Sequence, residues 1–183
     1  LFQYDNPRIT QWAISLLGDL PADQSAPVYE YLIDAMNPPD NAKPLRSEAD
    51  QIALAVSSVS KLYESHPDAV LNRLKSAKPE SKMQQCILLG LLDVKSDDVA
   101  EAGAMIARSK PTRSACLACL LLAKHRATLS EQDRALLGTM ASGGGMVSEV
   151  LQVQAAWLYL KHTNQVNVLL QSMNQSLGSP TTP

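Results

Sequence analysis

The chain has little of three things: aromatic side chains, cysteine, and an excess of charge of either sign. Aromatic residues make up only 4% of its 183 residues although 45% are hydrophobic, so buried surface must come mainly from small and aliphatic side chains. Such side chains favour closely packed helices. The net charge is -2, which leaves no overall positive field to attract nucleic acid or an anionic membrane.

The three cysteines lie in apolar runs, and an odd number in that setting favours reduced core thiols over a disulfide framework. No apolar stretch approaches the ~20 residues that a membrane-spanning helix needs. The chain starts at Leu1 rather than Met, and no charged leader follows. We therefore expect an excerpt or a processed product, with a cytoplasmic location favoured and export left open.

Helix start and stop signals recur along the chain, and no run alternates like a strand. Ser47 and Ser96 are each followed by two carboxylates, which the positive end of the helix dipole favours. Pro7, Pro67 and Pro79 suit first turns. We predict ten helices, at residues 7–19, 23–36, 47–65, 67–77, 79–92, 96–108, 112–126, 130–141, 147–163 and 165–175.

Similar apolar runs recur at intervals of 30 to 42 residues, each followed by a second apolar helix. Their equivalent positions are Gly18, Ser60, Gly90, Ala123 and Leu160. One helix pair per period of this length is typical of a solenoid, in which each repeat buries its face against its neighbours. Small residues at the first four positions let paired helices approach closely. An irregular helical bundle is the alternative, because Leu and Ala stripes arise in any α-protein.

The first repeat joins a Leu-Gly pair to an Ala-Pro-Val helix start, at Leu17-Gly18 and Ala26-Pro27-Val28, and residues 86–99 carry Leu89-Gly90 with an Asp-Asp-Val junction. In these residues the chain resembles the HEAT-like (armadillo-type) repeat family, and most of all its short bacterial form. The resemblance implies an all-α, right-handed α-solenoid of about five helix pairs over residues 1–175. The Gly, Ser, Pro and Thr content of residues 176–183 predicts a flexible tail or the start of a linker. It also implies a protein-binding scaffold, and it transfers no catalytic residue.

Patterns that would indicate catalysis or metal binding are incomplete. Cys116 and Cys119 form a Cys-x-x-Cys pair inside an apolar run, but no second pair or His-x-His spacing completes four ligands. The glycines at 143–145 follow no strand and precede no Lys-Ser/Thr ending, so they predict a turn rather than a phosphate loop. We therefore predict that the protein is not an enzyme and holds no metal or cofactor.

One regional charge signal stands out, because residues 102–130 contain no acidic side chain. The basic residues of this stretch are Arg108, Lys110, Arg113, Lys124 and Arg126. If they converge, an anionic partner, either nucleic acid or an acidic peptide, can dock there. The predicted helix at 112–126 separates the first three from the last two, so the sequence leaves convergence open.

Two Lys-His pairs, Lys124-His125 and Lys161-His162, end predicted helices one repeat apart. Stacked on one edge, the two pairs would form one basic surface. Cations at helix C-termini also have a purely structural use, since they offset the negative end of the dipole by roughly 0.3–1 kcal/mol each.

Taken together, the sequence predicts a non-catalytic scaffold that binds a protein or peptide on the concave face formed by the second helix of each pair. The proposed contacts are polar and aromatic positions on those helices: Tyr29, Glu30, Asn72, Arg73, Glu101, Arg134 and Gln165. Trp157 and Tyr159 fit instead an interface with further repeats. The alternative function is nucleic-acid binding through the basic stretch 108–126.

Overall fold

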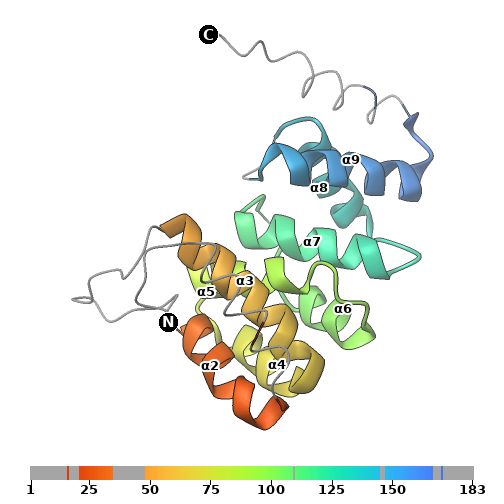
Figure 1. The fold of residues 1–183 in the computed structure, drawn as a ribbon. Helices are drawn as coiled ribbons and strands as arrows, with labels where there is room; N and C mark the ends of the chain where they lie inside the picture. The colour runs from red at the N-terminus through yellow and green to blue at the C-terminus, as the bar shows by residue number, and fades with distance from the viewer. Residues whose placement is uncertain are drawn as a thin grey trace, which may run out of the picture. The chain divides into compact units, whose positions relative to one another are not determined.

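The structure is a computed structural model that describes residue 16 and residues 21–34, 48–108, 110–144, 147–166 and 170. Within these residues every regular element is an α-helix and no strand occurs, so the chain is all-α as predicted. The helices are α2 (Ala22–Asp34), α3 (Glu48–Ser65), α4 (Pro67–Ser76), α5 (Lys82–Leu91), α6 (Asp97–Ala104), α7 (Arg113–His125), α8 (Glu131–Ala141) and α9 (Glu149–Thr163) (Figure 1). The predicted helices at 7–19 and 165–175, and the predicted tail at 176–183, lie almost wholly outside the described residues.

Side chains fix several helix starts. Ser81, Thr112 and Ser130 precede α5, α7 and α8, and each side-chain oxygen accepts a hydrogen bond from a backbone N–H of the first turn. Pro67 is the first residue of α4, as predicted. Pro79 does not open a helix, because Glu80 adopts a left-handed φ of 59° and α5 begins only at Lys82.

The sixth helix is shorter than the predicted 96–108, since α6 ends at Ala104. After this point the chain turns back, and the Arg108 guanidinium Nη1 donates to the carbonyls of Gly103, Ala104 and Ile106 at 2.9 to 3.2 Å. The last carbonyls of a helix have no partner within it. Arg108 therefore caps the end of α6, and this explains why the helix stops there.

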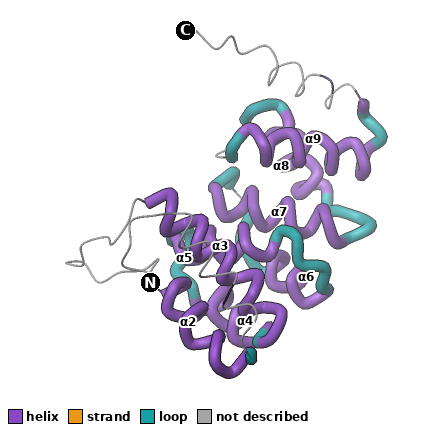
Figure 2. The backbone as a smooth tube through the Cα atoms, viewed as in Figure 1, coloured by secondary structure: helices purple, strands orange, loops and turns teal. Residues whose placement is uncertain are grey.

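The chain divides into two compact units, Leu1–Val94 and Lys95–Pro183, and each is described by itself. In the first unit α3 packs against α2, α4 and α5, and α5 also contacts α4 and α2. In the second unit α7 packs against α6, α8 and α9, and α8 packs against α9. Short loops join the successive helices within the described parts of each unit (Figure 2).

The closest helix approach in the first unit depends on small residues. A Cβ placed on Gly90 of α5 would lie 2.6 Å from the Val59 Cβ and 2.7 Å from the Val56 carbonyl oxygen of α3. The Ser60 hydroxyl of α3 donates to the Gly90 carbonyl at 2.6 Å. Two of the positions predicted to be equivalent therefore meet directly. The contact joins the first helices of successive predicted pairs, however, rather than two helices of one pair.

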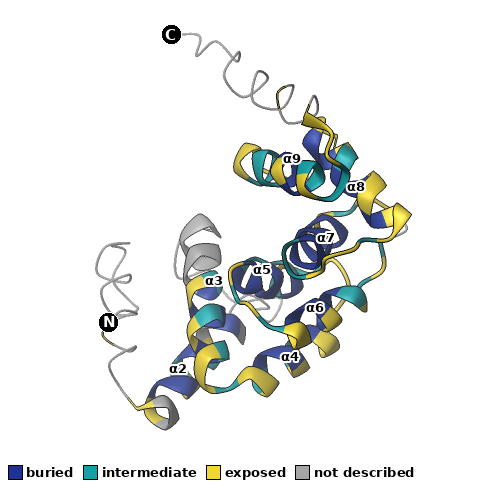
Figure 3. Ribbon diagram, turned by 90° about the vertical axis from the view of Figure 1, so that its right-hand side faces the viewer, coloured by how far each residue is buried: buried dark blue, intermediate teal, exposed yellow. Residues whose placement is uncertain are grey.

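The core of the second unit is built around α7, whose residues from Ser114 to Ala123 are all buried (Figure 3). Leu137 and Met140 of α8 and Ala155 and Ala156 of α9 are fully buried beside it. Despite this apolar character, no helix in the described ranges is both long and apolar enough to cross a membrane.

Candidate functional site

The predicted protein-contact residues of the first unit differ in exposure. Tyr29 of α2 is only 2% exposed, which corrects its predicted place on an exposed face. Burial, followed by the nearby Glu64 carboxylate, raises the pKa of its phenol. Glu30 and Arg73 form an ion pair of 3.5 Å between α2 and α4, and Asn72 is exposed on α4.

In the second unit, the predicted contacts Glu101, Arg134 and Gln165 are exposed and lie on α6, on α8 and just after α9. Gln165 accepts a hydrogen bond of 3.0 Å from the Tyr159 hydroxyl. The structure thus brings one predicted pair, Glu30 with Arg73, into contact. The other contact positions stay predictions.

The five residues predicted as an anionic-ligand site do not gather at one place. Lys110 and Arg113 are exposed at the start of α7, while Lys124 and Arg126 lie at its end. A helix of 13 residues spans about 20 Å. The structure therefore places these cations in two groups at opposite ends of α7.

Arg108 belongs to neither group, because its side chain is directed into the second unit. Besides capping α6, its Nε donates to Asp133 Oδ1 at 2.5 Å, and both side chains are largely buried. Asp133 Oδ2 also accepts a hydrogen bond from Ser130, the N-cap of α8. Arg108 is thus a structural clamp between the α6 end and the α8 start, and its predicted role as an anion ligand is corrected by this engagement.

The two Lys-His pairs do come together at one end of the second unit. His162 Nε2 donates to the Ala123 carbonyl of α7 at 2.8 Å, so the last turns of α7 and α9 adjoin. The pKa of His125 lies below its ordinary 6.5 because of burial and then the neighbouring Lys124, with Lys161 and Lys95 acting in the same direction. Its Nε2 is shielded from solvent and has no partner among the described residues. We call Lys95, Lys124, His125 and Lys161 the basic ridge.

The Cys-x-x-Cys pair has the properties of core packing. Cys116 and Cys119 are both fully buried, and the Cys119 thiol donates to the Asp133 carbonyl at 3.3 Å. Burial, with Asp133 as the second cause, raises the pKa of Cys119 to about 12, and a thiol with so high a pKa is a poor nucleophile. The described residues contain no group of three potential metal ligands.

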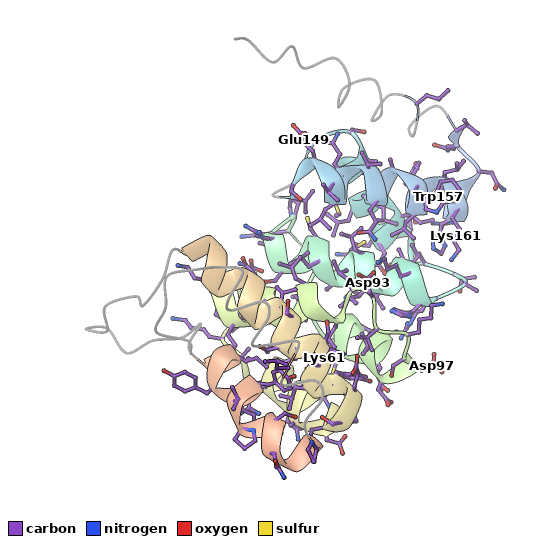
Figure 4. The ribbon with its side chains drawn as sticks, viewed as in Figure 1. Lys61, Asp93, Asp97, Glu149, Trp157 and Lys161 are labelled. Atoms are coloured by element: carbon purple, nitrogen blue, oxygen red, sulfur yellow. The ribbon has the colours of Figure 1, made fainter. Side chains whose placement is uncertain are left out.

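Two strongly exposed apolar side chains of the second unit lie on α9. Val150 is 78% and Trp157 59% exposed, although both are apolar. Val153 and Leu160, which share their side of the helix by spacing, are half-buried. We call these four residues the α9 stripe. Lys161 lies near Trp157 at one end of the helix and Glu149 at the other (Figure 4).

Sequence reasoning assigned Trp157, together with Tyr159, to an interface, but it did not identify the other three residues of the α9 stripe. In α9 apolar residues occupy both faces, since Ala155 and Leu158 are buried away from the stripe. A helix that is apolar all round is normally enclosed. The signal for the remaining stripe residues is the presence of apolar side chains on both faces of one predicted helix. Comparisons with known proteins found no matching family model, curated protein or solved structure.

Proposed function

We propose that the chain is a non-catalytic protein-interaction scaffold, built as a right-handed α-solenoid of HEAT-like helix pairs, and that the α9 stripe is one of its binding surfaces. The packing order supports the solenoid. With the exception of α2 with α5, each helix packs against helices one or two places along the chain, as in arrays where a repeat contacts only its neighbours.

The observation that carries the scaffold function is the exposure of Trp157 and Val150 on one helix face. Tryptophan is enriched in protein interfaces because it buries a large apolar area when a partner covers it. The polar interior groups, by contrast, already have intramolecular uses: Arg108 and Asp133 hold a turn, and Cys119 is protonated at neutral pH. Binding through exposed helix faces accounts for both observations.

A capture experiment tests the scaffold function. The immobilised chain is exposed to an extract of its source cells, and retained proteins are compared for the wild type, Trp157→Glu and Met105→Glu. Met105 is a matched control, because it is 67% exposed in the same unit but lies on α6's end rather than on α9. Apolar contacts survive high salt, so we expect a protein set that persists at about 500 mM salt, is lost in Trp157→Glu and is kept in Met105→Glu. Equal retention by all three proteins would contradict the proposal.

The basic ridge supports a second candidate function, the binding of an anionic partner such as nucleic acid. In addition to burial, which lowers the pKa of His125 most, three lysines lie close enough to lower it further, and the Asp97 carboxylate acts in the opposite direction. The lysines are Lys124 of α7, Lys161 of α9 and Lys95, which precedes α6. Binding of this kind weakens steeply with salt because counterions are released from the nucleic acid. Filter retention of DNA or RNA at about 50 mM salt, lost in Lys124→Glu/Lys161→Glu, would establish it. No retention at that salt concentration would exclude it.

A further inference from the structure

The α9 stripe has the spacing of a coiled-coil seam. Its members Val150, Val153, Trp157 and Leu160 are separated by three, four and three residues, which is the a/d pattern by which one helix packs along another. The opposite face of α9 is occupied inside the unit: Tyr159 lies against Gly138, and Gln152 donates to the Ala141 carbonyl of α8. The stripe is therefore a helix-packing face that the described residues leave open.

The spacing of the stripe residues is also symmetric along the helix. Val150 and Leu160 lie equally far from Ala155 along the sequence, and so do Val153 and Trp157. If two copies of α9 run antiparallel about a two-fold axis at the level of Ala155, Val150 of one copy meets Leu160 of the other. Trp157 then meets Val153, a large side chain against a small one, which is the alternation that lets facing side chains interdigitate.

The charges at the ends of α9 have the same symmetry. Glu149 and Lys161 are both exposed and lie equally far from Ala155 in opposite directions. An antiparallel pair brings the acidic first turn of each copy beside the basic last turn of the other, and it also opposes the two helix dipoles favourably. A parallel pair would instead bring like charges together. The charge pattern thus complements a second copy in one orientation.

We propose that the α9 stripe binds a second copy of this chain, forming an antiparallel helix pair related by a two-fold axis. The inference rests on the proposed function to the extent that the stripe is a protein-binding surface, and it names the partner. Two-fold dimers are the commonest symmetric oligomers, with one self-complementary patch on each copy. Because one helix pair is smaller than the roughly 1,200–2,000 Å² of a standard interface, the dimer is expected to dissociate in the micromolar range.

Sedimentation velocity of the full chain from about 1 to about 300 µM tests the dimer. We expect the wild-type mass to rise with concentration from 19.8 kDa toward twice that value. Trp157→Glu places a charge in the seam and is expected to weaken association by at least about 100-fold, while Met105→Glu associates like the wild type. A wild type that stays monomeric throughout this range, or a Trp157→Glu chain that associates equally well, overturns the proposal.

Charge exchange tests the orientation. In an antiparallel pair, Glu149→Lys and Lys161→Glu each bring like charges together twice, so each weakens association about three- to tenfold at low salt. The double variant Glu149→Lys/Lys161→Glu restores opposite charges at both ends and is expected to recover wild-type affinity. A parallel pair has like charges together in the wild type and the double variant alike, and each single substitution leaves that count unchanged. Equal affinity of all four proteins, or no recovery in the double variant, overturns the antiparallel arrangement.

The dimer and the scaffold function can fail separately. If the wild type is monomeric but Trp157→Glu still loses its captured proteins, the second copy is excluded as the partner and the scaffold function stands. If the dimer forms but the capture experiment retains no protein, the stripe is an oligomerisation surface and binding of other proteins through it is excluded.

Discussion

Substituting Gly90 by Ala tests the claim that α3 and α5 are held together by close backbone approach. The added Cβ would lie 2.6 Å from the Val59 Cβ and 2.7 Å from the Val56 carbonyl oxygen. Neither atom is the far end of a flexible side chain, since one is attached directly to the α3 backbone and the other belongs to it. The two helices must therefore move apart.

Three contributions set the size of the effect. Overpacking a close-packed core costs about 1–3 kcal/mol. Separation of the helices also weakens the bond from Ser60 to the Gly90 carbonyl, which contributes about 1 kcal/mol. Alanine in a helix interior returns about 0.8–1.0 kcal/mol relative to glycine. The free energy of unfolding is therefore expected to fall by about 1–3 kcal/mol, and the melting temperature of a chain of this length by about 3–10 °C.

Urea unfolding followed by far-UV circular dichroism measures the change, and Gly103→Ala is the matched control. At Gly103 in α6 an added Cβ meets the Ala118 carbonyl oxygen at 3.5 Å and the Leu121 Cβ at 3.6 Å, which are ordinary contacts. We expect Gly103→Ala to be neutral or stabilising by up to about 1 kcal/mol. A Gly90→Ala chain as stable as the wild type would show that α3 and α5 do not approach as described.

Three further predictions concern the second unit. Arg108→Met leaves the buried Asp133 carboxylate without its cation and should lower the free energy of unfolding by about 3–5 kcal/mol. In the same urea assay, the double variant Arg108→Met/Asp133→Asn should lose clearly less stability than the two single variants lose together. Additive losses would contradict the clamp. The pKa of His125 is depressed in the folded state, so the unfolded chain binds the proton first as pH falls. The stability that this histidine contributes is therefore present above pH 6.5 and lost below it. The urea midpoint of His125→Gln should fall less than that of the wild type between about pH 7.5 and 5.5, and an equal fall would refute the assignment. All three thiols are buried, at Cys86, Cys116 and Cys119, so the native chain should resist labelling by a thiol-reactive disulfide reagent. Rapid labelling of the native chain would show that the core opens.

The helices could be predicted from the sequence because local start and stop signals mark their ends. Ser81, Thr112 and Ser130 cap helices through local hydrogen bonds, and such signals need no knowledge of the rest of the fold. The α6 end could not be predicted in the same way. It depends on Arg108 reaching Asp133, which lies 25 residues away, and a contact at that distance is set by tertiary packing rather than by the local pattern.

The same distinction explains the site predictions. Tyr29 was placed on an exposed face because its helix phase is ambiguous: Tyr29 is buried while Tyr31, two residues on, is 58% exposed. The basic stretch was visible as a run of charges, but composition says nothing about which cation meets a carboxylate. The sequence raised the stacking of the two Lys-His pairs as one of two interpretations, and the bond from His162 to the Ala123 carbonyl places the ends of α7 and α9 side by side.

Helices α7 and α9 show how the surroundings of a helix change what one apolar pattern indicates. Both are apolar on all sides, yet every residue of α7 from Ser114 to Ala123 is buried, because α6, α8 and α9 pack around it. Within the described residues of the second unit, α9 packs only on the α7 and α8 side, which leaves Trp157 exposed. A helix face in contact with water is normally polar. An apolar seam at that place is accounted for by a partner that covers it, and a face whose apolar and charged positions are both symmetric about Ala155 selects a second copy of itself.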